Sequence, residues 1–247
     1  MRILVDLKPS DPALGLAVEE VLLDSVRQEG CETIRVWINE RAVILGRSQS
    51  LAAEVDETQA RVLGIPVLRR MSGGGTVYHY PGNLNVSVLL RKRSDVSEVS
   101  SVFRFFGGLL SEALSRLVPT MYTEDNGLYV DGLKVGGAAQ AHRGSAVLYH
   151  TTLLVRPSPI PMERLLLAMR PGYRWEGIAS RPRPMTSLAE YLSRPIEPQE
   201  VVEPILDALA SGLSVCLEMS RLTAGEAAGA VALGKEKYGS PTWNQRL

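Results

Sequence analysis

The chain has 247 residues, of which 45% are hydrophobic and only 6% aromatic, and its 27 lysines and arginines balance its 27 aspartates and glutamates. A chain of this length can bury a sizeable core as one large domain or as two small ones. Balanced charge excludes a general electrostatic attraction to nucleic acid or to an anionic membrane, so we expect neither partner and favour a small substrate or a protein surface.

The two cysteines, Cys31 and Cys216, lie far apart and form no Cys-x-x-Cys pair. The sequence therefore indicates neither a disulfide framework nor a zinc site, and a reduced, cytoplasmic setting fits. No stretch of the sequence reaches the roughly 18 apolar residues that a membrane span needs. The chain opens on strand-like residues rather than on a charged segment followed by an apolar run, so we expect a soluble protein.

The N-terminal part of the chain predicts one helix and several short strands. Asp11 and Pro12 suit a helix start, with aspartate as the cap and proline at the first helical position, and apolar residues share one face through residue 27. Alternating or short apolar runs predict strands at residues 34–38, 42–45 and 65–68.

The segment RRMSGGGTVYH, residues 69–79, is the most informative part of the chain. Three consecutive glycines can adopt positive φ and bring several N–H groups to one ligand oxygen, and arginine adds planar, permanently charged donors. The segment is either a cradle for a phosphate or carboxylate or a flexible hairpin connection between strands. A turn at residues 81–83 and an alternating strand at 84–89 would hold the glycine loop on a rigid support.

The next part of the chain alternates a helix with strands. A helix over residues 98–117 carries an apolar stripe. Asp131-Gly132 favours a type I′ hairpin turn between a strand at 128–130 and one that starts at Lys134. Residues 146–155 are long and apolar enough for a central strand.

Prolines recur between residues 157 and 204, with short helical pieces at 161–169 and 185–192, so we expect this part to wrap one end of the sheet. A capping box of Thr223 and Glu226 predicts a last helix that Gly239 could end. No internal repeat or convincing linker interrupts the chain, so residues 1–247 are expected to form a single α+β domain.

Lys134 lies between the predicted turn and a run of small residues, Gly136–Ala139, where a ligand could approach the backbone closely. It is either a solvated strand lysine or an ammonium that neutralises a ligand carboxylate or phosphate beside the glycine loop. No Gly-Lys-Ser/Thr ending and no Gly-x-Gly-x-x-Gly helix start are present, which argues against a P-loop kinase and a dinucleotide enzyme. The histidines lack metal-ligand spacing, so we assign no metal ligands.

The chain resembles the lipoate-protein ligase family over most of its length. The resemblance rests on residues 69–87, 130–140 and 150–155, and more weakly on residues 12–23, 37–49 and 237–244. It implies an α+β fold of mixed β-sheets flanked by helices, the biotin/lipoyl protein ligase catalytic-domain fold, with an apolar tunnel for the acyl chain. The chain looks like such a catalytic domain without the C-terminal accessory domain of larger ligases, and we expect a small separate subunit to assist adenylation.

This resemblance implies that lipoate is activated with ATP and Mg²⁺ to lipoyl-AMP. The lipoyl group then passes to one lysine of a lipoyl-carrier domain, in an E2 subunit of a 2-oxoacid dehydrogenase complex or in the H protein of the glycine cleavage system. The adenylate is the activated acyl donor, so no covalent enzyme intermediate is needed.

The resemblance also implies roles for the residues singled out above. Lys134 would contact the lipoyl carboxylate and the α-phosphate, and Asn83 and His150 would position the ligands. In the glycine segment, one group of residues would hold the ATP phosphates and the adenylate: Arg70, Gly75, Thr76, Val77 and Tyr78. A second group would shape the loop: Arg69, Gly73 and Gly74.

Two other functions stay open. A related octanoyltransferase uses a cysteine thioester, yet residues 118–129 contain no cysteine and neither Cys31 nor Cys216 is placed to replace it. A catalytically idle lipoate- or nucleotide-binding paralogue is the other alternative. Tyr80 and Gly127 favour it, since both stand where the ligase pattern has an aspartate and a missing carboxylate could weaken Mg²⁺ binding or the positioning of Lys134.

Overall fold

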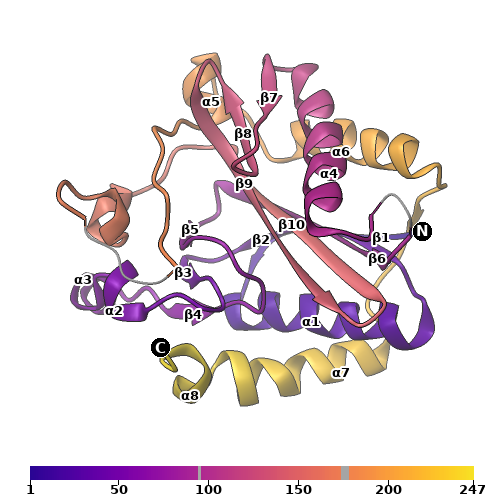
Figure 1. The fold of residues 1–247 in the computed structure, drawn as a ribbon, viewed down its shortest axis with the longest axis horizontal. Coiled ribbons are helices and arrows are strands. Elements are labelled where there is room, and N and C mark those ends of the chain that lie inside the picture. The colour runs from indigo at the N-terminus through magenta and orange to yellow at the C-terminus, as the bar shows by residue number, and fades with distance from the viewer. Residues whose placement is uncertain (94–95, 174–177) are drawn as a thin grey trace.

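The computed structural model describes residues 1–93, 96–173 and 178–247. Its strands are β1 (Arg2–Ser10), β2 (Thr33–Asn39), β3 (Ala42–Leu45), β4 (Val67–Arg69), β5 (Val77–His79), β6 (Asn83–Arg91), β7 (Thr120–Tyr122), β8 (Gly127–Val130), β9 (Leu133–Arg143), β10 (Ala146–Leu154) and β11 (Glu218–Met219). They form an eight-stranded sheet in the order β11-β1-β2-β6-β10-β9-β8-β7 and a three-stranded sheet in the order β4-β3-β5 (Figure 1). Both sheets mix parallel and antiparallel pairs.

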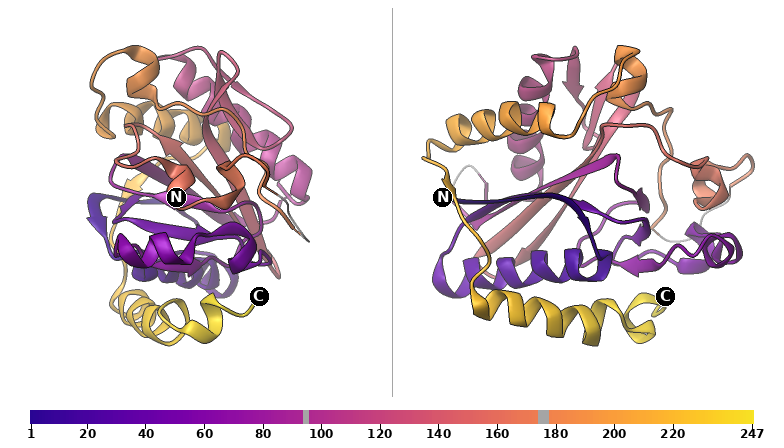
Figure 2. Two further views of the ribbon diagram at one scale, coloured as in Figure 1. Left: turned by 90° about the vertical axis from the view of Figure 1, so that its left-hand side faces the viewer. Right: turned by 180° about the vertical axis from the view of Figure 1, so that it is seen from behind.

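Helices cover both faces of the large sheet. They are α1 (Pro12–Glu29), α2 (Leu51–Glu54), α3 (Glu57–Val62), α4 (Val99–Ser115), α5 (Leu188–Leu192), α6 (Gln199–Leu213), α7 (Ala224–Leu233) and α8 (Pro241–Asn244), with short 3₁₀ turns η1 (Met162–Arg164) and η2 (Leu167–Met169) and a π turn η3 (Gly234–Tyr238). Figure 2 shows α1 and α7 below the large sheet and α4 and α6 above it. No helix of the described segments is long and apolar enough to cross a bilayer.

The alternation of side chains along the central strand β10 divides the core between these two helical layers. Val147 and Tyr149 pack in the cluster that contains α4 and α6, whereas Ala146 and Leu148 pack in the cluster that contains α1. Successive strand residues point to opposite faces, so a strand buried on both faces needs apolar residues at consecutive positions. The predicted central strand at 146–155 is thereby confirmed, and so is the expected class of mixed sheets flanked by helices.

Local signals in the sequence located several elements correctly. The Asp11 carboxylate accepts from the Leu14 N–H at 2.8 Å and caps α1, as predicted. Asp131 (φ 47°) and Gly132 (φ 78°) both have the positive φ that a type I′ turn requires, and they join β8 to β9. Thr223 and Glu226 form the predicted capping box, and the helical stretch that it begins, α7 with the π turn, ends at Gly239. It is not the last helix, because α8 follows it.

The structure rules out one alternative and shows one helix that the sequence analysis missed. The glycine segment is not a hairpin connection, because β4 and β5 do not pair with each other; both pair with β3, from opposite sides. The missed helix is α6, which runs from Gln199 to Leu213 with Pro204 inside it. Proline forfeits one helix hydrogen bond there, but burial of one face of α6 against α4 offsets the loss.

Candidate functional site

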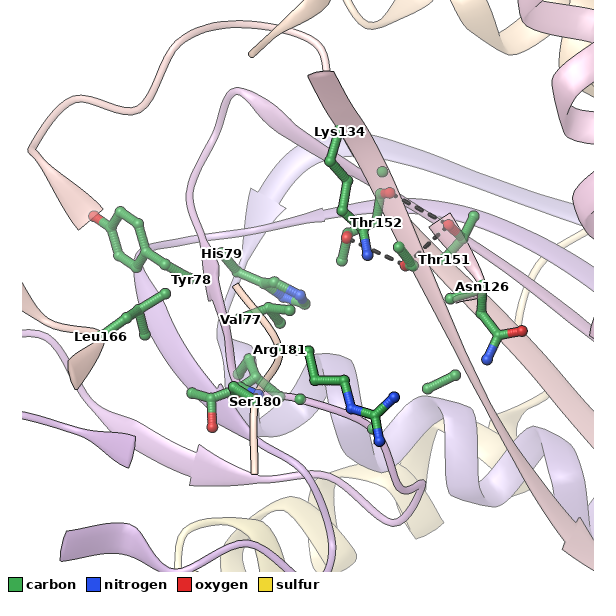
Figure 3. Close-up of a pocket in the computed structure, with 18 of the residues that line it drawn as sticks. Val77, Tyr78, His79, Asn126, Lys134, Thr151, Thr152, Leu166, Ser180 and Arg181 are labelled. Carbon is green, nitrogen blue, oxygen red and sulfur yellow. Dashed lines mark hydrogen bonds between the residues drawn. The ribbon is translucent and has the colours of Figure 1, made fainter. Parts of the chain in front are cut away.

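Nine of the eleven site residues expected from the sequence meet in one cavity of about 690 Å³. Its walls are β5 with the glycine loop on one side and β9 with β10 on the other, and Figure 3 shows Lys134 and Arg181 in it with His79 and Val77. The expected residues that line it are Arg70, Gly74, Gly75, Thr76, Val77, Tyr78, Asn83, Lys134 and His150. Arg69 and Gly73 do not line the cavity, whereas Gly74, for which the resemblance implies the same role of shaping the loop, does.

Arg70 organises the glycine loop from inside. Its Nη2 donates to the carbonyl oxygens of Gly73 (2.5 Å) and Gly75 (2.8 Å), and its Nε donates to the Ser72 hydroxyl (3.0 Å). Burial lowers the pKa of Arg70 to about 10, so the guanidinium is charged at neutral pH. With these carbonyls held toward Arg70, the N–H of Thr76 is free to point elsewhere and donates to the Ser180 hydroxyl at 2.9 Å.

Lys134 reaches the cavity from β9 with its stem against two glycines. A Cβ added at Gly127 would meet Lys134 Cε at 3.0 Å, and one added at Gly137 would meet it at 3.3 Å. Both glycines therefore leave a slot for this side chain. Burial lowers the pKa of Lys134, and Asp125, whose Oδ2 lies 3.7 Å from Nζ, partly opposes that effect.

Asp125 supplies a carboxylate close to where the sequence showed the departure at Gly127. Burial opposes its ionisation, but hydrogen bonds from Thr123 (2.5 Å) and Tyr129 (2.6 Å) and the charge of Lys134 lower the pKa of Asp125 to about 2. Arg183 adds a second cation at 3.4 Å. The carboxylate is therefore ionised at neutral pH and fixes the ammonium of Lys134.

A buried hydrogen-bond chain joins α1 to the glycine loop. Glu19 Oε1 contacts His150 Nδ1 at 2.8 Å and accepts from the Ser87 hydroxyl at 2.6 Å. His150 Nε2 lies 2.7 Å from the hydroxyl of Ser72, the residue that Arg70 also contacts. Burial opposes the charge of Glu19, yet His150, the Ser87 hydroxyl and the charge of Arg35 together outweigh it and lower the pKa of Glu19.

The histidine and tyrosine that follow the glycine loop have structural partners. Burial lowers the pKa of His79 to about 3, and its Nδ1 lies 2.9 Å from the Asn39 amide nitrogen. This histidine is therefore neutral at physiological pH and accepts from Asn39. Tyr80, the other departure from the ligase pattern, is buried and donates from its hydroxyl to the Arg156 carbonyl at 2.7 Å.

Ser180 ties a segment distant in sequence to the glycine loop. Its hydroxyl donates to Glu54 Oε2 at 2.5 Å, and its N–H donates to Glu54 Oε1 at 3.0 Å. The same hydroxyl accepts from the Thr76 N–H and from the Gln49 amide at 3.1 Å. Ser180 thus closes one side of the cavity over the loop (Figure 3).

The sequence analysis missed several residues of the cavity. They are Glu19, Glu54, Asp125, Ser180, Arg181 and Arg183. Acidic and polar residues at positions that are buried in the fold give no local signal, since an isolated glutamate in an amphipathic helix usually faces solvent. Asp125 alone had a pointer, because it lies two residues before Gly127, where the sequence departs from the ligase pattern.

Metal ligands do not cluster in the described part of the chain. Among those residues, no group of three or more histidine, cysteine, aspartate or glutamate side chains could hold a metal ion. Mg²⁺ usually binds through one or two carboxylates and completes its coordination with water and substrate phosphates. Asp125 in the cavity wall is compatible with that mode of binding.

Comparison with known proteins identifies relatives over the whole chain. The family model of the lipoyl protein ligase A/B catalytic domain matches residues 11–210. A protein of Aeropyrum pernix named "Putative lipoate-protein ligase A" is 36% identical over 157 residues, which are 63% of this chain and 58% of that relative. Lipoate-protein ligase A subunit 1 of Thermoplasma acidophilum is 26% identical over 257 residues, covering 100% of this chain and 97% of that one.

Two further similarities bear on the fold and on the reaction. A solved structure of a bi-partite lipoate protein ligase and its E2 lipoyl domain from Thermoplasma acidophilum matches with a TM-score of 0.85 at 26% identity, covering 99% of this chain and 95% of that chain. Octanoyltransferase LipM of Symbiobacterium thermophilum is 29% identical over 258 residues, covering 94% of this chain and 93% of that relative. Sequence similarity therefore reaches both ligases and a transferase.

Proposed function

Because the chain belongs to the family of lipoyl protein ligase A/B catalytic domains, we propose that it activates lipoate with ATP to lipoyl-AMP and transfers the lipoyl group to a carrier lysine. Membership of the family and the class of enzyme, a lipoate-protein ligase, agree with the expectation from the sequence. The route through lipoyl-AMP and the identity of the carrier are our proposal. We also propose that residues 1–247 form one catalytic domain that works in the cytoplasm.

The observation that carries this proposal is the meeting of the glycine loop and Lys134 in one cavity. Adenylation brings a carboxylate and a triphosphate together, so the site must offset concentrated negative charge. Lys134, Arg70, Arg181 and Arg183 line the cavity and can supply positive charge. The Thr76 N–H, now bonded to the Ser180 hydroxyl, is a donor that a phosphate oxygen could take over.

The reaction requires two bond exchanges. In the first, a carboxylate oxygen of lipoate bonds to the α-phosphorus of ATP, and the bond to pyrophosphate breaks. In the second, the amine nitrogen of the carrier lysine bonds to the acyl carbon, AMP leaves and the amine loses a proton. We assign to Lys134 the offsetting of charge on the carboxylate and α-phosphate, and to Asn83 and His150 the positioning of the ligands. Gly75–Tyr78 would hold the phosphates and adenylate.

The bonds of Arg70 refine its expected role. Its guanidinium donates to three main-chain carbonyls and to Ser72, so we propose that it shapes the loop in addition to adding positive charge near the phosphates. Mg²⁺ would screen the phosphate charge when bound, and Asp125 is the carboxylate on the Lys134 side that would hold it.

The positions of the cysteines favour a ligase over an octanoyltransferase. A thioester route needs a cysteine in the cavity, yet Cys31 and Cys216, the two cysteines of the chain, do not line it. The contacts of Asp125 weigh against an idle binder, because a carboxylate accompanies Lys134 despite the glycine at position 127. The departure at Tyr80 leaves a buried, hydrogen-bonded tyrosine rather than a gap.

We propose a lipoyl-carrier domain as the protein substrate and a small accessory subunit that assists adenylation. The subunit-1 name of one relative and the bi-partite ligase with its E2 lipoyl domain support both partners. The H protein of the glycine cleavage system is the alternative carrier.

A mass-spectrometric assay tests the proposal. The protein is incubated with an apo carrier domain and either lipoate with ATP or octanoyl-acyl carrier protein, each with and without an accessory subunit. We expect modification from free lipoate only when ATP is present. Modification only from the acyl carrier protein would establish the transferase, and no modification in any mixture would favour the idle binder. Full adenylate formation by the protein alone would refute the need for an accessory subunit.

A further inference from the structure

We propose that Trp243 and Asn244 are positioning residues for the glycine loop and that they act through Arg69. The proposal rests on the proposed function, because it concerns the site that binds lipoate and ATP. Both residues belong to α8, near the C-terminal end of the chain. They lie outside residues 11–210, the range that the family model matches.

The two side chains complete the open edge of the small sheet. β4 pairs with β3 on one side only. On its other side, Trp243 Nε1 donates to the Arg69 carbonyl at 2.7 Å, and the Arg69 N–H donates to Asn244 Oδ1 at 2.9 Å. These side chains thus bond both main-chain polar groups of Arg69, as a neighbouring strand would.

The Arg69 side chain extends this contact to the turn at Gly46–Gln49. Its guanidinium has no exposed surface and donates to main-chain carbonyls: Asn244 at 3.0 Å from Nη2, Gln49 at 2.6 Å and Gly46 at 3.0 Å, both from Nη1. Burial lowers the pKa of Arg69. A buried guanidinium needs most of its donors satisfied. The Asn244 carbonyl belongs to the main chain, so the side chains of Trp243 and Asn244 act on this contact by holding α8 beside Arg69.

The turn at Gly46–Gln49 packs tightly against the glycine loop. The Arg47 N–H donates to the Ser72 carbonyl at 2.8 Å, and Gln49 Oε1 accepts from the Thr76 hydroxyl at 2.8 Å. A Cβ added at Gly46 would lie only 2.0 Å from the Gly74 carbonyl oxygen. A displacement of this turn is therefore transmitted directly to the loop that faces the cavity.

Other contacts hold the C-terminal segment in place. Two cations lie over the Trp243 ring, Lys237 Nζ at 4.1 Å and Arg246 Cζ at 4.0 Å from its centre. The Asn244 amide donates to the Tyr238 carbonyl at 2.7 Å. Lys237 and Tyr238 both bond Glu20 of α1, so the segment is anchored to the helical layer under the large sheet.

The test compares Trp243→Phe and Asn244→Ala with a control, Gln245→Ala, whose side chain is exposed one residue further on. The first readout is KM for ATP and for lipoate against kcat of adenylate formation, with the accessory subunit if the wild type needs it. The second is hydrogen exchange of the amides of Ser72–Thr76. We expect KM for ATP to rise about tenfold in Asn244→Ala and at least threefold in Trp243→Phe, with loop exchange faster by similar factors.

Unchanged KM and loop exchange in Trp243→Phe would overturn the proposal, even if its melting temperature fell, since that outcome shows a structural role alone. Trp243→Phe keeps the ring and removes one hydrogen bond, so it decides the question if Asn244→Ala fails to fold. An inactive wild type would refute the proposed function, and the exchange measurement would still test the link from Trp243 to the loop.

Discussion

Replacing Lys134 with alanine should strongly slow activation of the acid while the fold stays intact. The Lys134 side chain lines the cavity, and its partner Asp125 keeps other hydrogen bonds and another cation when the lysine is removed. Asp125 retains the hydroxyls of Thr123 and Tyr129 and the guanidinium of Arg183 when Lys134 is lost. The substitution therefore leaves the Asp125 carboxylate with hydrogen-bond partners and a neighbouring positive charge.

The magnitude follows from the geometry of the ion pair. At 3.7 Å, two unit charges attract by about 1 kcal/mol in water and by about 4.5 kcal/mol at an effective dielectric constant of about 20. Desolvation of the ammonium, which lowers the pKa of Lys134, offsets most of that attraction. We expect the free energy of unfolding to fall by about 1 kcal/mol. Loss of a preorganised cation should lower the rate of adenylate formation roughly 10²- to 10³-fold.

Urea unfolding and a pyrophosphate-release assay measure the two quantities on the same preparation. Lys235→Ala is the matched control, because it removes an exposed lysine from η3. Both quantities should stay at wild-type values in the control. If Lys134→Ala kept more than a tenth of the wild-type rate, or lost several kcal/mol of stability, Lys134 would not be the charge-offsetting group of a preformed cavity.

Two further outcomes test the packing and the electrostatics. Gly46→Ala should lower the melting temperature and disable the site, because its Cβ would lie 2.0 Å from the Gly74 carbonyl oxygen. Gly73→Ala is the control and should melt as the wild type does, because a Cβ at Gly73 meets nothing within 4 Å. Equal melting temperatures of the two variants would contradict this prediction. Burial opposes ionisation of Glu226, but hydrogen bonds from Arg2, the Thr223 N–H and Ser25 outweigh that effect and lower its pKa from 4.5 to about 2. Its contribution to stability is complete above pH 4.5 and is lost as pH falls to about 2, and Glu226→Gln should abolish this pH dependence in urea titrations at acid pH.

The sequence alone determined the elements whose signals lie within a few residues. The Asp11 cap and the Thr223–Glu226 box each place a side chain three residues from the N–H group that it accepts from. The turn at Asp131-Gly132 needs positive φ at two adjacent residues, which aspartate tolerates and glycine adopts freely. The glycine segment and Lys134 were likewise recognisable, because small residues next to a cation indicate close approach of a ligand.

Only the tertiary structure decided what the two adjacent arginines do. Arg69 binds the turn at Gly46 and the carbonyl of Asn244, and Arg70 binds the loop it precedes. Likewise, the contact of Glu19 with His150 joins residues 131 positions apart. A buried charge takes its role from the polar groups that replace its hydration water. For Arg69 and Glu19 these groups come from segments distant in the sequence, and Arg70 adds the Ile44 carbonyl on β3 to its contacts within the loop.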